Sequence, residues 1–153
     1  MQPSEAIVEF LRWWEGLPGG KPALQAYDDG GGVWTIGYGT TRDVRPGNEC
    51  SEDEALEMLL DDLEETWSEI DPLIRVTIAQ HELDALVSLA YNIGVEAFRK
   101  STLLSRLNAG DFGSASDEFV RWNRQGGRIL PGLVKRRAAE RRIFDDADYS
   151  GRP

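Results

Sequence analysis

Apolar side chains near the start of the chain recur with the period of an α-helix. They lie at positions i, i+3, i+4 and i+7 and form one stripe: Ile7, Phe10, Leu11 and Trp14. Ser4 precedes this run with an N-capping side chain, and Gly16 follows it where a glycine ends many helices. Glu15 is therefore predicted to be the last helical residue, at the end of the helix that carries partial negative charge.

The periodicity changes between residues 23 and 49. Three short runs have the composition of strands: Leu24–Tyr27, Val33–Gly39 and a piece near Arg45–Glu49. They are separated by Asp-Asp-Gly-Gly-Gly at 28–32 and by Arg-Pro-Gly-Asn at 45–48, which are both typical of turns. The pattern predicts a small antiparallel sheet in a lobe separate from the helices.

Helical periodicity resumes at residue 51 and continues almost to the end of the chain. Ser51 and Glu54 have the spacing of a capping box, and the helix that they open is expected to end at Pro72. Shorter helices are predicted at four further places: about 77–94, 101–110, 113–123 and 132–145. The predicted fold class is α+β. A single domain over 1–153 would hold a β lobe at about 16–50 and a helical lobe at about 51–148, joined by the long helix, with a cleft between them.

The net charge of the chain argues against some classes of binding partner. The formal net charge is −10, which argues against nucleic acid and against an anionic membrane surface, because both require clustered Lys and Arg. Basic residues do gather at 121–142, where they form either a locally positive surface for an anionic polymer or simply a solvated basic helix face. The N-terminus has no signal-peptide pattern, and no apolar run reaches the roughly 18 residues of a transmembrane helix. We expect a monomer that is made in the cytoplasm, without stable membrane insertion.

Neither a disulfide nor a metal site is expected. Cys50 is the only cysteine, which excludes an internal disulfide and a cysteine-based metal cluster. His81 is the only histidine and is expected to be a surface or packing residue, because no ligand set can be built around it. We expect no cofactor.

Two carboxylates in different surroundings are the minimum that hydrolysis of a glycosidic bond requires, one protonated and one ionised. Glu15 suits the acid, because a helix end and apolar neighbours disfavour a charged carboxyl. Asp29 suits the base, because a glycine-rich turn leaves it exposed and offers backbone N–H groups. Thr35 could direct its hydroxyl toward a water near Asp29. Each feature alone is common, so the hypothesis rests on their combination.

The combination resembles a known family. "WEG" at 14–16, followed by "AYDDGGGVWTIGYGTT" at 26–41, is similar to the phage-type lysozymes, the muramidases of glycoside hydrolase family 24. The resemblance continues in "QHELDALVSLAYNIGVEAFRKSTLLSRLNAGDF" and in "RW…GG…LPGLVKRRAAERRIF". It spans about Ala6 to Phe144, with the motifs in order and at compatible spacings, and it implies a lysozyme-like α+β fold.

The resemblance implies roles for six residues. Glu15 takes the general-acid position, and Asp29 and Thr35 take the positions that activate water. Asp28 stays an alternative to Asp29, which is preferred because the family's aspartate lies two residues after the strand's aromatic and six before the threonine. Three further residues match positions along the saccharide groove: Thr41, Tyr91 and Ser101. For Tyr91, a ring packed into the core is an equally open interpretation.

One position departs from the family pattern. Thr40 replaces the histidine that often follows "TIGYG". The resemblance implies that this histidine is mainly structural, so we expect altered local stability rather than lost catalysis. A semi-buried Glu in a cleft commonly has a basic neighbour, and Arg136 or Arg137 is the candidate beside Glu15. Core or surface pairing is the alternative for both arginines.

These features predict a muramidase that cleaves the β-1,4 bond between N-acetylmuramic acid and N-acetylglucosamine in peptidoglycan, with inversion at the anomeric carbon. Two alternatives stay open: a non-catalytic peptidoglycan-binding module of the same fold, and hydrolysis of a related polymer such as chitin. The enzyme would act in the periplasm or at the cell wall, as a phage endolysin or as the catalytic domain of a secreted antibacterial effector. An effector would require an immunity or inhibitor protein as its partner.

Overall fold

The computed structural model describes all residues from Met1 to Pro153 and contains seven α-helices, two short 3₁₀ helices and two small β-hairpins. The elements follow the chain in this order: α1 (Glu5–Glu15), β1 (Ala23–Asp28), β2 (Trp34–Gly37), α2 (Glu52–Ile70), η1 (Asp71–Leu73), α3 (Gln80–Ile93), α4 (Val95–Arg99), α5 (Thr102–Asn108), α6 (Phe112–Glu118), η2 (Phe119–Arg121), β3 (Arg124–Gln125), β4 (Arg128–Ile129) and α7 (Pro131–Asp146).

Helix α1 forms as its pattern predicts. The Ser4 hydroxyl accepts a hydrogen bond from the backbone N–H of Ile7 at 3.3 Å, and the apolar stripe is buried except for Trp14, which is partly buried. Gly16 ends the helix, but its φ of −79° is open to any residue. An added Cβ there would lie 2.5 Å from the carbonyl oxygen of Arg12 and 2.8 Å from that of Lys21. The close approach of two backbone segments therefore explains the glycine after Glu15.

The β lobe is smaller than predicted. Strands β1 and β2 pair antiparallel and form one hairpin. The predicted third strand near Arg45–Glu49 is wrong, because only Glu49 forms a bridge, with Gln25. The residues before it form a turn instead: the backbone N–H of Asn48 donates to the carbonyl of Arg45 at 3.1 Å, and the N–H of Arg45 donates to Oδ1 of Asn48 at 2.7 Å.

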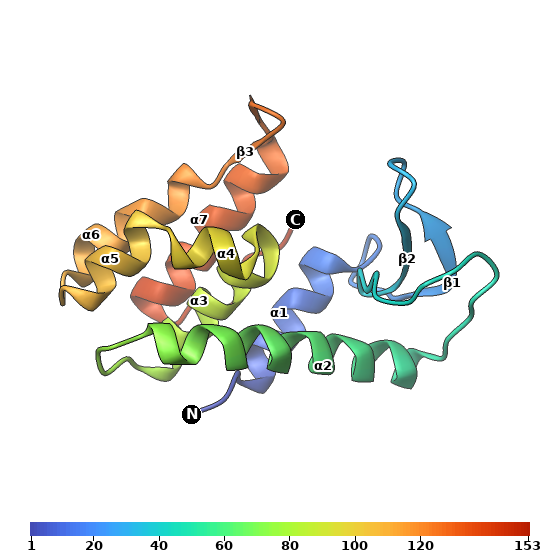
Figure 1. The fold of residues 1–153 in the computed structure, drawn as a ribbon, viewed down its shortest axis with the longest axis horizontal. Coiled ribbons are helices and arrows are strands. Elements are labelled where there is room, and N and C mark those ends of the chain that lie inside the picture. Colours follow the sequence, from blue (N-terminus) through green and yellow to red (C-terminus); the bar gives the residue numbers. More distant parts are fainter.

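Helix α2 connects the two lobes, and in Figure 1 it runs beneath both, from the β1–β2 hairpin to the helical bundle. Its capping box forms as predicted. The N–H of Glu54 donates to the Ser51 hydroxyl at 3.1 Å, and the N–H of Ser51 donates to Oε2 of Glu54 at 2.7 Å. The predicted α+β class, with a small β lobe and a larger helical lobe, is confirmed.

Helix α3 is the centre of the helical lobe. Every residue from 83 to 90 is buried, and α7 packs along this helix. The helix begins at Gln80 rather than at the predicted Thr77, and the Glu82 side chain accepts from the N–H of Ala79 at 2.6 Å to cap it. The predicted helix at 113–123 divides into α6 and η2.

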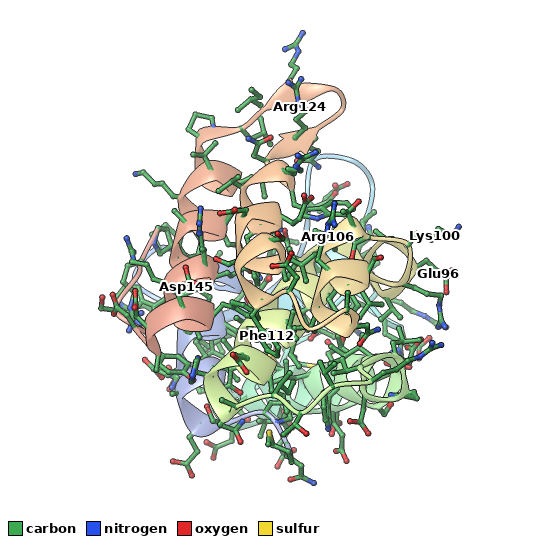
Figure 2. The ribbon with its side chains drawn as sticks, turned by 90° about the vertical axis from the view of Figure 1, so that its left-hand side faces the viewer. Glu96, Lys100, Arg106, Phe112, Arg124 and Asp145 are labelled. Carbon is green, nitrogen blue, oxygen red and sulfur yellow. The ribbon has the colours of Figure 1, made fainter.

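Two elements of the helical lobe have no counterpart in the sequence prediction. One is the single-turn helix α4, and the other is the β3–β4 hairpin. Gly126 and Gly127 form the turn of this hairpin with φ values of 58° and 78°, which glycine adopts without strain. Figure 2 shows Arg124 extending from the hairpin away from the body of the lobe.

The helical lobe holds both ends of the chain. The N–H of Ser4 donates to Oδ1 of Asp84 at 3.0 Å, and the hydroxyl of Tyr149 donates to Oδ2 of the same carboxylate at 2.6 Å. The last residues then pass α1, where the indole N–H of Trp14 donates to the carbonyl of Gly151 at 3.3 Å. None of the helices combines the length and the apolar character that a membrane crossing requires.

Candidate active site

Glu15 lies at the end of α1, and its side chain is 18% exposed. Nη1 of Arg136, from α7, lies 2.6 Å from its Oε1. Arg136, rather than Arg137, is therefore the basic neighbour of Glu15. Arg136 itself is buried, so the carboxyl is the member of the pair that a ligand can reach.

A cavity of about 390 Å³ opens beside Glu15. Its wall comes from the end of α1, the loop after β2, the middle of α2 and the end of α3. The lining residues are Glu15, Gly39, Thr41, Arg42, Asp62, Glu65, Thr66, Tyr91 and Asn92. Thr41 and Tyr91, which the family resemblance places along the saccharide groove, are thus brought into the same cavity as Glu15.

Tyr91 belongs to both the core and the cavity. Its side chain packs against the buried apolar cluster, and the residue also lines the cavity together with Glu15. Burial, reinforced by the negative charge of Glu15, raises the pKa of the Tyr91 phenol above its ordinary value. The hydroxyl consequently keeps its proton at physiological pH and can donate a hydrogen bond to a ligand.

Asp29 and Thr35 are joined through the backbone of Val33, by its N–H and its carbonyl. The N–H of Val33 donates to Oδ1 of Asp29 at 3.2 Å, and the hydroxyl of Thr35 donates to the carbonyl of Val33 at 3.2 Å. The N–H of Gly31 also donates to Oδ1 of Asp29, at 2.7 Å, while Oδ2 has no partner in the chain. The hairpin thus holds one carboxylate oxygen and leaves the other to solvent.

The strand register places Asp28 and Asp29 on opposite faces of the hairpin. Tyr27 lies opposite Thr35, and the ladder continues beyond β1 because the N–H of Asp29 donates to the carbonyl of Val33 at 3.0 Å. Side chains alternate between the two faces of a strand. Asp29 therefore lies on the face of Tyr27 and Thr35, and Asp28 lies on the opposite face.

Thr40 retains a structural contact at the position where the family often has histidine. Its hydroxyl donates to Oδ2 of Asp62, on α2, at 3.0 Å. Burial raises the pKa of Asp62 above its ordinary value, and the hydrogen bond from Thr40 only partly offsets this effect. The contact joins the β lobe to α2 at the edge of the cavity.

Arg136 is part of a network of four charged side chains, of which all but Glu15 are buried. Its Nε lies 3.1 Å from Oε1 of Glu140, one turn along α7. Arg137 contacts the same carboxylate, with its Nε 2.9 Å from Oε2. Burial opposes the charge of Arg136, but the carboxylates of Glu15 and Glu140 outweigh burial and raise the pKa of its guanidinium.

Ser101 does not lie in the cavity that contains Glu15. It lines a separate hollow of about 680 Å³ beside α5. Its hydroxyl is used within the fold, donating to the carbonyl of Phe98 at 2.7 Å and accepting from the N–H of Leu104 at 3.1 Å. The structure therefore gives Ser101 the role of an N-cap, and a contact with saccharide stays a prediction.

Sequence reasoning missed Asn92. It lines the cavity beside Tyr91, and Nη2 of Arg137 donates to its Oδ1 at 2.8 Å. Because the amide oxygen is occupied, the amide nitrogen is the group left for a ligand. His81 packs in the helical lobe, with Nδ1 3.0 Å from the carbonyl of Ile143. No group of three His, Cys, Asp or Glu residues is arranged to hold a metal ion.

The chain is similar in sequence to phage lysozymes and phage endolysins. A sequence model of the family described as phage lysozyme matches residues 5–140. An endolysin of Bacillus phage B103 is 48% identical over 145 residues, which is 94% of this chain and 54% of that protein. An endolysin of Acyrthosiphon pisum secondary endosymbiont phage 1 is 38% identical over 151 residues, covering 96% of this chain and 100% of that protein. The chain therefore spans the whole of one such relative and about half of the other.

A solved structure is similar over almost the whole length. The endolysin from Escherichia coli O157:H7 phage FAHEc1 superposes with a TM-score of 0.88 at 35% sequence identity. The match covers 97% of this chain and 96% of that one. The agreement includes the β lobe, α2 and the helical lobe, which together enclose the cavity beside Glu15.

Proposed function

The chain belongs to the phage lysozyme family, and we propose on this basis that it is a muramidase, which hydrolyses the β-1,4 bond between N-acetylmuramic acid and N-acetylglucosamine in peptidoglycan. The observation that carries the proposal is the position of Glu15. A carboxyl at the end of α1, paired with buried Arg136, opens into a cavity between the two lobes. A glycan strand lying between the lobes would pass directly over it.

In the proposed reaction, Glu15 is the general acid. Its carboxyl donates a proton to the glycosidic oxygen as the bond to the anomeric carbon breaks. Tyr91 and Asn92 line the same cavity, and we assign the Tyr91 hydroxyl and the Asn92 amide nitrogen to hydrogen bonds with the sugar. Thr41 would contact the glycan from the side of the β lobe.

Asp29 and Thr35 are proposed to hold and activate the attacking water. The free Oδ2 of Asp29 can accept a proton from water, and the Thr35 hydroxyl lies on the same face of the hairpin. This shared face supports Asp29 over Asp28. A water held by these two groups attacks the face of the sugar opposite to the leaving oxygen, which gives inversion and requires carboxyl groups roughly 6.5–9.5 Å apart.

The proposed function is tested with purified peptidoglycan. We expect the wild type to clear the suspension and to release reducing sugar ends, and Glu15→Gln to do neither. Glu9→Gln is the matched control, because it removes a carboxylate from the same helix at an exposed site that pairs only with Arg12. Proton NMR of the first released ends identifies the product anomer, and an α-anomer indicates inversion of the β-linkage.

The alternative of a binding module without activity makes a different prediction. The wild type would then sediment with the wall but release no reducing ends. Purified chitin in the same assay distinguishes a related polymer as substrate. Cleavage of chitin at a rate equal to that of peptidoglycan would contradict the proposed specificity.

The proposed site of action is the bacterial cell wall, in the periplasm or at its surface. An endolysin and the catalytic domain of an antibacterial effector would use the same cleft. An effector would in addition need an immunity or inhibitor protein, and this partner, like the monomeric state, stays a prediction. Size-exclusion chromatography with light scattering tests the monomer.

A further inference from the structure

Glu140 is a fully buried carboxylate that does not reach the cavity. It belongs to α7, its exposed fraction is 0%, and three side chains contact it. The hydroxyl of Ser88, on α3, donates to its Oε1 at 2.7 Å, and Arg136 and Arg137 contact it from the preceding turn of α7. A buried carboxylate is costly unless it is paired, so this arrangement requires an explanation beyond packing.

From these contacts we propose that Glu140 is a positioning residue for the general acid. It holds Arg136 between two carboxylates, so that Arg136 fixes the direction of Glu15 without fully stabilising its ionised form. This inference rests on the proposed role of Glu15 as the proton donor.

The two contacts of Arg136 explain how Glu140 can orient Glu15. Its Nε is 3.1 Å from Glu140, and its Nη1 is 2.6 Å from Glu15. The guanidinium is planar and presents its N–H groups in a fixed fork. Once Nε is held by Glu140, the direction of Nη1 is set. The carboxyl of Glu15 is therefore aligned from a rigid plane buried behind the cavity.

The charges of the network also bear on whether Glu15 keeps its proton. The network contains two carboxylates and two guanidinium groups, so its formal charges cancel. Arg136 is shared between Glu15 and Glu140, whereas Arg137 contacts Glu140 and donates to Asn92. The negative charge of Glu140 thus competes with Glu15 for one positive charge. A general acid must keep its proton until the substrate is bound, and a partly occupied arginine favours that state.

Other charged or titratable groups line the cavity with Glu15, and a substitution at Glu140 removes none of them. Asp62 and Glu65 line the cavity from α2, Arg42 lines it from the loop after β2, and Tyr91 lines it from α3. Arg42 pairs with Glu65 at the rim. None of these four side chains contacts Glu140, so a change at Glu140 acts on Glu15 through Arg136 and through the lost negative charge.

The test is the pH profile of kcat/KM for Glu140→Gln. Glutamine keeps the shape and one acceptor but removes the charge, which leaves Glu15 as the only carboxylate partner of Arg136. We expect the alkaline limb of the profile to move to lower pH by about one unit, and activity above that limb to fall about tenfold. Glu140→Asp restores the charge and is expected to move the limb back toward the wild-type position.

A matched control removes the same charge from the same helix. Asp145, labelled on α7 in Figure 2, pairs with Arg141 and Ser116 and contacts neither Arg136 nor Glu15. Asp145→Asn should leave the alkaline limb in place. A purely structural role for Glu140 would lower activity by the same factor at every pH. That outcome, or an equal shift in the Asp145 variant, would overturn the proposal.

Two further measurements apply if Glu140→Gln does not fold or if the wild type has no activity. If Glu140→Gln does not fold, the double variant Arg137→Gln/Glu140→Gln removes one charge of each sign and leaves the Arg136–Glu15 pair. Its alkaline limb should move in the same direction but less far, because the lost positive charge of Arg137 partly offsets the lost negative charge. If the wild type has no activity, the proposed function fails by itself. The titration of the Glu15 carboxyl carbon, followed by ¹³C NMR, then still tests whether it moves to lower pH in the Glu140 variant. An unchanged titration would refute the inference.

Discussion

Nη1 of Arg136 lies 2.6 Å from Oε1 of Glu15 and joins the last helix of the chain to the first. The arginine is buried and the carboxyl is partly open to the cavity. This contact fixes the carboxyl of Glu15 from behind the cavity and places a positive charge beside it. Substitutions at the pair should therefore change stability and the pH dependence of activity together.

Replacing Arg136 with Met should lower the free energy of unfolding by about 3–5 kcal/mol, because Glu140 is left buried without one of its partners. If Glu15 is the general acid, as we propose, loss of the nearby positive charge favours its protonated form, so the alkaline limb of the activity profile should move to higher pH. Urea denaturation and pH–rate profiles measure the two effects. Arg141→Met, which breaks partly exposed pairs on the same helix, should cost no more than about 1 kcal/mol.

Asp28 and Asp29 form a natural pair of test and control in the same turn. Asp29→Asn should lower kcat by about a hundredfold or more, because the variant has no carboxylate to accept a proton from the attacking water. Asp28→Asn should leave kcat within a few-fold of the wild type. Its side chain caps the N–H groups of Gly30 and Gly32, which an amide oxygen can still do. Equal losses in both variants would remove the reason for choosing Asp29.

Tyr91 and Ser101 have different expected effects, although the family resemblance gives both to the saccharide groove. Tyr91→Phe removes a hydroxyl from the cavity of Glu15 and should raise KM several-fold with little change in thermal stability. Ser101→Ala removes the N-cap of α5 and should cost about 1 kcal/mol of stability with KM unchanged. Steady-state kinetics on soluble wall fragments and thermal unfolding measure both. A raised KM for Ser101→Ala would extend the groove to that side of the lobe.

Asp62 should make stability depend on pH. Because burial raises its pKa in the folded state, the folded protein binds more protons than the unfolded chain between the two pKa values. The contribution of Asp62 to stability is then fully present below its ordinary pKa and is lost as pH rises through the raised one. Asp62→Asn cannot ionise and still accepts from Thr40, so its Tm relative to the wild type should increase from about pH 3 to about pH 7. A difference in Tm that is independent of pH would contradict this account.

Local patterns predicted the parts of the site that lie on single elements. The apolar stripe and the glycine after it placed Glu15 at a helix end, and the glycine-rich turn placed Asp29 on a hairpin. The family resemblance then supplied Thr41 and Tyr91, which lie in the cavity with Glu15. These features are encoded within a few residues of each position, or shared with relatives, and that is why they could be inferred.

Features that depend on tertiary packing could not be inferred in this way. Glu140 stands between arginines at the spacing of exposed helical ion pairs, and only the packing of α7 on α3 shows that it is buried. Asn92 has no pattern that marks it, because its role depends on Arg137. The β3–β4 hairpin does have a sequence signal, because Gly126-Gly127 is typical of a tight hairpin turn. The surrounding basic residues, however, indicate only a positively charged surface.

The contacts of Trp14 with Gly151 and of Glu15 with Arg136 also order events during translation. A ribosome releases α1 well before Arg136 and Gly151. Until then, the nascent chain contains Glu15 but neither the arginine nor the segment that contacts α1. The proposed hydrolysis should accordingly arise only after Gly151 has left the ribosome, and a nascent chain that stops before Arg136 should be inactive.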